Sequence, residues 1–198
     1  GGFRTFDGGV AIDVLACPIA GTSSGEKFWW GGVLTPSGVI GIPFQTTKVL
    51  RINPQTLACE HLSNVASHVG GGWFGGVLGL DGMVYAAPKT ALRILRIDPR
   101  DGGAVEVGPT FASPPLFSGA TLDRLGGVWL VAQGGGAPLT RFDPSDGGLW
   151  QAGADAGAPV NGMFGISRVP VSDGGDWLYT SPIEIGVTEL VRVDPESR

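Results

Sequence analysis

One four-residue motif occurs four times along this 198-residue chain: an arginine, an apolar residue, an acid or amide, and a proline. Its copies are Arg51-Ile52-Asn53-Pro54, Arg96-Ile97-Asp98-Pro99, Arg141-Phe142-Asp143-Pro144 and Arg192-Val193-Asp194-Pro195. Successive arginines are 45, 45 and 51 residues apart. A repeat of this length, built from short β-prone runs and turns rich in Gly, Asp and Pro, is typical of an architecture in which each copy is one four-stranded sheet.

Each repeat also carries an aromatic and glycine-rich stretch upstream of its arginine, at residues 29–34, 73–78, 117–122 and 163–166. A turn of hairpin composition and a second apolar strand follow, the latter at 39–43, 83–88, 128–132 and 177–182. Glycines in the first strand allow neighbouring sheets to approach closely around an axis, because glycine has no Cβ. We therefore predict an all-β fold, a four-bladed β-propeller, and interpret its six tryptophans mainly as core residues.

The predicted blades cover residues 28–62, 72–108, 117–153 and 162–198 of a single domain that spans residues 1–198. The last repeat lacks a fourth strand, and residues 9–15 have the composition of one. We expect this N-terminal strand to complete the last blade and close the ring, with Ala11 pairing near Val191. The alternative is that the chain is an arc of a larger propeller, because residues 4–7 resemble the third strand of a preceding repeat.

The repeated Arg-x-Asp places two opposite charges on one face of a strand, since residues i and i+2 point the same way. The motif recurs in every blade, so it cannot mark a single site. We predict an Arg–Asp ion pair within or between blades, with Asp-Pro also opening a hairpin turn. Asn53 replaces the aspartate in the first copy, and a neutral hydrogen bond would replace the ion pair there.

Composition limits the classes of function. A hydrophobic content of 42% is enough for the core of one soluble domain, and no apolar run reaches the roughly 18 residues that span a bilayer. The net charge is −5 with no basic stripe, so neither nucleic acid nor direct membrane insertion is expected. Cys17 and Cys59 could form a disulfide or could be two buried small hydrophobic side chains, and this pair does not assign a compartment.

In a propeller, the loops that follow the second and fourth strands share one face, which is where ligands and partners are expected. Six polar residues in these loops are our candidates for binding a ligand or partner: Gln45, Thr46, His68, Lys89, Gln133 and Glu184. The same loops carry an apolar, proline-rich set: Phe44, Phe111, Pro114, Pro115, Leu116 and Pro159. No motif for a nucleophile, a zinc ion, calcium or a phosphate is present, so we predict no catalytic residue, metal or cofactor.

Residues 28–198, with their Gly-Gly-Val-Leu, Asp-Gly and Leu-Arg-Ile-Asp-Pro elements, resemble the kelch-like or NHL-like propeller repeats of uncharacterised eukaryotic microbial proteins. That resemblance implies a propeller and usually a binding function. Residues 95–105 are also similar to the blades of streptogramin lyases, which would imply a magnesium-dependent elimination. Those enzymes use paired histidines and a glutamate, whereas only His68 and Glu184 are available here, so the resemblance does not transfer the activity.

Two functions from different classes are consistent with these features. The first is a non-enzymatic protein–protein interaction or scaffold module, acting alone or as a subunit of a larger complex, because the loops are apolar and proline-rich and no catalytic constellation is present. The alternative is a site for a small molecule or carbohydrate, or for lyase or hydrolase chemistry, at the central face.

Overall fold

The fold is all-β in a computed structural model that describes residues 28–66, 70–133, 138–152, 163–170, 175–182 and 191–195. The first sheet contains β1 (Trp29–Thr35), β2 (Gly38–Pro43), β3 (Lys48–Ile52) and β4 (Cys59–Asn64). The second contains β5 (Trp73–Leu78), β6 (Val84–Pro88), β7 (Ile94–Ile97) and β8 (Ala104–Val107). The third contains β9 (Phe117–Leu122), β10 (Val128–Ala132), β11 (Leu139–Phe142) and β12 (Leu149–Ala152). The fourth contains β13 (Met163–Pro170), β14 (Asp176–Pro182) and β15 (Val191–Val193).

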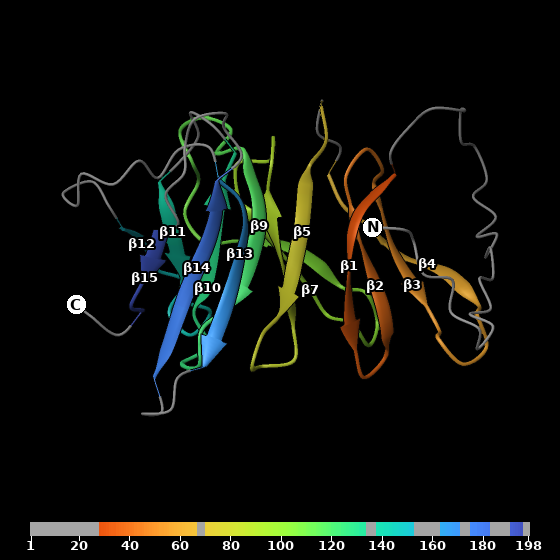
Figure 1. The fold of residues 1–198 in the computed structure, drawn as a ribbon. Coiled ribbons are helices and arrows are strands. Elements are labelled where there is room, and N and C mark those ends of the chain that lie inside the picture. The colour runs from red at the N-terminus through yellow and green to blue at the C-terminus, as the bar shows by residue number, and fades with distance from the viewer. Residues whose placement is uncertain are drawn as a thin grey trace, which may run out of the picture.

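Every sheet is an antiparallel meander in which neighbouring strands in the sequence are neighbours in space. The first strands of the sheets, β1, β5, β9 and β13, stand side by side in that order, and the first and last sheets lie at opposite ends of the row (Figure 1). The four-stranded antiparallel sheets of the first three blades confirm the predicted blade type, and the fourth sheet has three strands among the described residues. The strand expected at residues 9–15 lies outside the described residues, so the number of blades and the closure of the ring stay predictions.

Glycine allows the first two blades to approach closely. Gly31 and Gly75 lie on β1 and β5 and have φ angles of +84° and +67°, which side chains with a Cβ rarely adopt. A Cβ on Gly31 would lie 3.1 Å from the Cα of Gly75. The paired glycines therefore explain how the two innermost strands come together.

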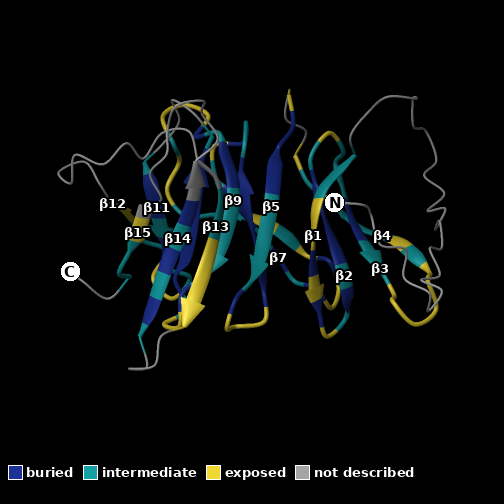
Figure 2. Ribbon diagram, viewed as in Figure 1, coloured by how far each residue is buried: buried dark blue, intermediate teal, exposed yellow. Residues whose placement is uncertain are grey.

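The hydrophobic core lies between adjacent blades rather than within one blade. One cluster joins blades one and two and includes Ile42 and Trp73, and a second joins blades two and three and includes Phe117. The second strands carry much of it: β6 and β10 are buried along their whole length. Most of β2 is also buried, as its dark blue colour in Figure 2 shows. Trp129 is also buried, but Trp150 is 47% exposed, so the prediction that tryptophans belong to the core is wrong for Trp150.

The acid or amide of the repeated motif builds the same turn in three blades. Oδ1 of Asn53, Asp98 or Asp143 accepts a hydrogen bond from the backbone N–H two residues later, at 2.9–3.0 Å. The backbone N–H of each of these three residues also donates across the hairpin to a carbonyl five residues on. The motif therefore opens the hairpin between the third and fourth strands, as predicted.

The arginines of the motif do not share one partner. Arg141 forms the predicted pair with Asp143, at 3.2 Å, and a second pair with buried Asp123, at 2.8 Å. Arg51 instead pairs with Glu60 and donates 2.8 Å to the carbonyl of Arg100 in the next blade. The ion-pair prediction is thus correct for the third blade. In the first blade, Arg51 instead links two blades by its hydrogen bond to a backbone carbonyl of the second blade.

Tyr85 provides a test of the packing between blades two and three. It is almost fully buried, and its hydroxyl donates to Oδ2 of Asp81 at 2.7 Å. Burial, and next the hydrogen bond and negative charge of Asp81, raise the pKa of Tyr85 to about 12. The unfolded chain ionises near pH 10, so this contribution to stability is complete below about pH 10 and is lost as the pH rises toward 12.

We expect the Tyr179→Phe variant, in which Tyr85 is the remaining tyrosine, to form tyrosinate with a midpoint near pH 12 while circular dichroism reports the folded state. The same variant in denaturant should titrate near pH 10, as an exposed tyrosine does. A midpoint near pH 10 in the folded protein would contradict the buried hydrogen bond between Tyr85 and Asp81.

Candidate functional site

Three equivalent positions on one face of the protein carry different side chains. Phe44, Lys89 and Gln133 each follow the second strand of their blade, and each backbone N–H donates to the residue before the first strand of the same blade, at 2.8–3.0 Å. The backbone is therefore repeated, while the side chain changes from aromatic to cation to amide. A side chain that is the same in every blade is explained by the repeated structure. A position whose backbone repeats but whose side chain differs between blades is therefore a candidate for function.

The backbone also ties these positions across blades. The carbonyl of Phe44 accepts a hydrogen bond from Gly72 at 2.8 Å, and the carbonyl of Lys89 accepts one from Leu116 at 3.2 Å. Gly71, with φ of +103°, lies directly under the ring of Phe44, where a Cβ would clash. Phe44 and Lys89 are thus each held by their own blade and by the next one, and Gln133 is held by its own blade, which makes the site rigid.

Three aromatic rings meet at the first two of these positions. The ring centroid of Trp30 lies 4.5 Å from that of Phe74 and 5.2 Å from that of Phe44. Phe44 and Phe74 are 6.1 Å apart in an edge-to-face arrangement. These are favourable geometries for aromatic pairs, so the rings form a preorganised apolar surface.

A lysine lies at the edge of this aromatic surface. Nζ of Lys89 donates to Oε1 of Gln133 at 2.8 Å and lies 5.3 Å from the ring centroid of Phe74. Partial burial lowers the pKa of Lys89 from its usual value. Among the described residues no carboxylate forms an ion pair with Lys89. Its positive charge is met by an amide and a π face, which leaves it able to bind an anion.

We call Trp30, Phe44, Phe74, Lys89 and Gln133 the loop-face cluster. Of the six residues predicted from the sequence, the structure brings Lys89 and Gln133 together, although they are 44 residues apart and on different blades. Gln45 is exposed next to Phe44, and Thr46 accepts a hydrogen bond from the backbone of Lys48 in a local turn. His68 and Glu184 lie outside the described residues.

Sequence reasoning placed Phe44 on this face but missed Trp30 and Phe74. Trp29 and Trp73 are equivalent, since each indole N–H donates to a backbone carbonyl of its own blade at 2.9–3.0 Å. The next residue in each strand, Trp30 or Phe74, points to the opposite face. The alternation of neighbouring positions in a strand was the signal that could have separated Trp30 from the core tryptophans.

The apolar, proline-rich loops offer less surface than the sequence suggested. Phe111 packs against buried Phe117 with ring centroids 5.5 Å apart, and Pro115 is buried. Pro114 is exposed, and Pro159 lies outside the described residues. Pro115 is therefore not part of an exposed apolar surface, and half-buried Phe111 packs against the core between the second and third blades.

Cys59 is in a disulfide bond and has no free thiol. The other cysteine of the sequence, Cys17, lies outside the described residues. Of the two alternatives left open by the sequence, the disulfide is therefore the correct one for Cys59, and the interpretation as a free buried side chain is wrong for it.

Within the described ranges, no group of three or more His, Cys, Asp or Glu side chains could hold a metal ion. No helix in these ranges is long and apolar enough to cross a membrane.

No protein-family profile matches this sequence. No curated protein matches it either. Among solved structures, a streptogramin B lyase is similar over 85% of this chain and 55% of its own, with a TM-score of 0.59 and 15% identity. A gluconolactonase from Xanthomonas campestris matches 86% of this chain and 59% of its own, with a TM-score of 0.62 and 16% identity. A PQQ-bound aldose sugar dehydrogenase from Streptomyces coelicolor matches 86% of this chain and 61% of its own, with a TM-score of 0.58 and 19% identity.

These similarities establish the class of fold. The structural neighbours are β-propeller-type proteins, so the chain has a propeller-type fold, in agreement with the repeat. The chain spans less than two thirds of the length of these neighbours. At 15–19% identity the likeness concerns the fold alone, because one propeller scaffold carries many unrelated sites.

Proposed function

We propose that this protein is a binding module whose loop-face cluster holds a small aromatic anion, such as an aromatic carboxylate. The observation that carries the proposal is the position of Lys89, a partly buried cation placed between an aromatic surface and an amide. Such a cation favours a negatively charged ligand, since an anion would restore the solvation that burial removes.

The other members of the cluster support the same chemistry. The half-buried rings of Trp30 and Phe44 provide a face on which a planar apolar ring can stack, and the buried ring of Phe74 packs against both of them. Oε1 of Gln133 accepts from Lys89, which leaves its NH₂ group to donate to a ligand oxygen. The cluster holds no carboxylate or histidine that could act as a base, so we propose binding without catalysis at this site.

A panel of four small molecules tests the proposal. We expect benzoate and 2-naphthoate to bind, as seen in nuclear magnetic resonance spectra and thermal shift at fixed ionic strength. Acetate lacks the ring and benzamide lacks the charge, so each should bind at least tenfold more weakly than benzoate if both parts of the cluster contribute. Equal binding of benzamide and benzoate, or no binding of any aromatic acid, would contradict the proposal.

Lys89→Met should weaken benzoate binding by roughly 10- to 100-fold, because a hydrogen bond to a charged group contributes about 1.5–3 kcal/mol. Lys48→Met is the matched control, since Lys48 is also half-buried and lies at the start of β3, where its hydrogen bonds are to Trp29 and Thr46 rather than to members of the cluster. Isothermal titration calorimetry of both variants measures the effect. Equal affinities for the two variants would remove Lys89 from the site.

A second candidate is the protein–protein interaction or scaffold role, with a partner protein and membership of a larger complex. Exposed apolar side chains favour it: Leu34 and Leu80 are each 70% exposed, and Leu125 is 56% exposed. They lie in the strands and turns at the end opposite to the loop-face cluster. The kelch-like character of the repeat also stays a prediction.

A further inference from the structure

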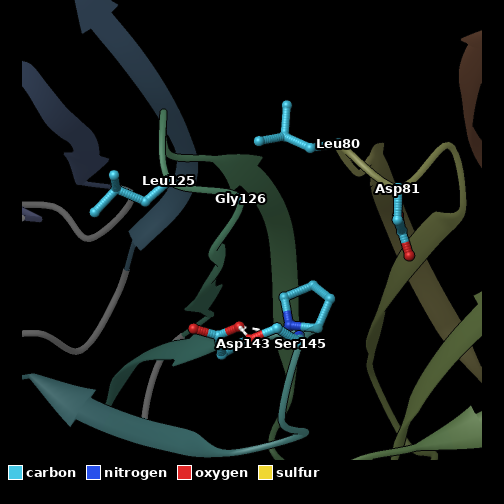
Figure 3. Close-up of a pocket in the computed structure, with 7 residues that line it drawn as sticks. Leu80, Asp81, Leu125, Gly126, Asp143 and Ser145 are labelled. Carbon is cyan, nitrogen blue, oxygen red and sulfur yellow. Dashed lines mark hydrogen bonds between the residues drawn. The ribbon is translucent and has the colours of Figure 1, made fainter.

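Two exposed leucines flank a cleft between the second and third blades. Leu80 lies in the turn between β5 and β6, and Leu125 lies in the turn between β9 and β10. The cleft has a volume of about 240 Å³ and is also lined by Asp81, Asp143 and Pro144 (Figure 3). We call this the hairpin-face cleft, because hairpin turns of neighbouring blades form its walls.

The walls of the cleft are held in place. Gly126 has φ of +91°, and a Cβ there would lie 3.3 Å from Cδ1 of Leu80, so the two turns are in contact. Leu125 donates its backbone N–H to Oδ1 of buried Asp123, which fixes the turn between β9 and β10. Both leucines are therefore exposed on rigid backbone, and exposed apolar groups on rigid elements are typical of interaction sites.

The cleft is negatively charged. Oδ1 and Oδ2 of Asp81 accept hydrogen bonds from the N–H of Met83 and the hydroxyl of Tyr85, and no described cation pairs with Asp81. Asp143 shares the guanidinium of Arg141 with Asp123, so two carboxylates have one cation between them. Hydrogen bonds from Ser145, and next the hydrogen bond and positive charge of Arg141, lower the pKa of Asp143 from its usual value.

Volume and charge together select the occupant. Pockets for drug-sized ligands have about 300–1,000 Å³, and this cleft is smaller, so it fits a side chain rather than a whole small molecule. We propose that the hairpin-face cleft docks a partner peptide in which a lysine or arginine is flanked by apolar residues. The basic side chain enters between Asp81 and Asp143, while the flanking residues cover Leu80 and Leu125. This proposal is independent of the loop-face cluster.

A labelled peptide tests this docking site directly. The probe is the peptide acetyl-Gly-Leu-Arg-Leu-Gly-amide with a fluorophore at one end, followed by fluorescence anisotropy with the whole chain. The control peptide replaces the arginine with glutamine, which keeps length but removes the charge. We expect the arginine peptide to bind about tenfold more tightly, with a difference that shrinks as salt is added.

Variants of the protein locate the peptide. The double variant Leu80→Ser/Leu125→Ser removes two exposed side chains and should weaken peptide binding at least about tenfold without unfolding the protein. Asp81→Asn removes the charge and keeps one of the two acceptor oxygens, so the preference for arginine over glutamine should fall severalfold. Leu34→Ser is the matched control, because Leu34 is as exposed as Leu80 but does not line this cleft.

Several results would overturn the proposal. Equal binding of the arginine and glutamine peptides, absence of binding at millimolar peptide, or binding that Leu80→Ser/Leu125→Ser leaves unchanged would each do so. In sedimentation experiments without peptide, the protein should not self-associate through Leu80 and Leu125. Self-association that the double variant abolishes would mean that a second copy of the chain occupies the cleft, contrary to the proposal.

Discussion

Replacing Asp123 with alanine is expected to lower the free energy of unfolding by about 3–5 kcal/mol, the usual cost of removing one member of a buried ion pair. The Asp123 side chain is fully buried. Its carboxylate accepts hydrogen bonds from the backbone N–H of Leu125 and Gly127, the indole of Trp129 and Nε of Arg141, all at 2.8–2.9 Å. Alanine would leave these donors without their acceptor in the interior.

Asp146→Ala is the control for this loss. Asp146 is an exposed turn residue whose carboxylate accepts one backbone N–H, from Gly148, at 2.8 Å, so its removal should cost no more than about 1 kcal/mol. Urea unfolding followed by circular dichroism compares the two variants. Equal midpoints for Asp123→Ala and Asp146→Ala would show that the buried carboxylate does not stabilise the third blade.

Gly102→Ala is expected to cost about 2–4 kcal/mol, because it adds backbone strain to a steric clash between blades. Gly102 has φ of +76° in the turn between β7 and β8, and a Cβ there would overlap the side chain of Leu62 in β4. Its carbonyl also accepts a hydrogen bond from the hydroxyl of Ser63. The substitution therefore pushes the second blade away from the first.

The third blade supplies a matched control at the equivalent turn position. Gly147 also has φ of +76°, but a Cβ there meets nothing within 4 Å. Gly147→Ala should therefore show the backbone strain alone, about 1–2 kcal/mol. The difference between the two alanine variants in urea unfolding measures the packing between blades one and two. If Gly102→Ala were no more destabilising than Gly147→Ala, the close contact between Gly102 and Leu62 would be contradicted.

The local elements could be predicted from the sequence. The second strands expected at 39–43 and 128–132 are found at Gly38–Pro43 and Val128–Ala132, and the first strand expected at 73–78 is found at Trp73–Leu78. These predictions succeeded because the apolar runs are short, the turns contain Gly, Asp and Pro, and four copies of one pattern reinforce each other. The turn opened by the motif acid is equally local, so it was predictable too.

The side-chain contacts between blades were not predictable in the same way. The partners of Arg51 and Arg141 differ although the motif is the same, because each arginine reaches whatever group the neighbouring turn presents. The contact between Lys89 and Gln133 joins residues 44 positions apart, and its distance depends on how two blades pack. A local pattern identified these two residues as polar and placed them on one face, but it could not pair them with Trp30 and Phe74.

The most direct test of the proposed function is the pKa of Lys89 with and without an aromatic acid. The chain has three lysines, so lysine labelled with ¹³C at Cε gives few signals, and Lys89→Met assigns the one of interest. Without ligand, burial should hold the pKa of Lys89 below the usual value for lysine. Benzoate should raise this pKa while benzamide leaves it unchanged, because a bound anion stabilises the protonated amine. A Lys89 signal that responds equally to both compounds, or to neither, would contradict an anion site at the loop-face cluster.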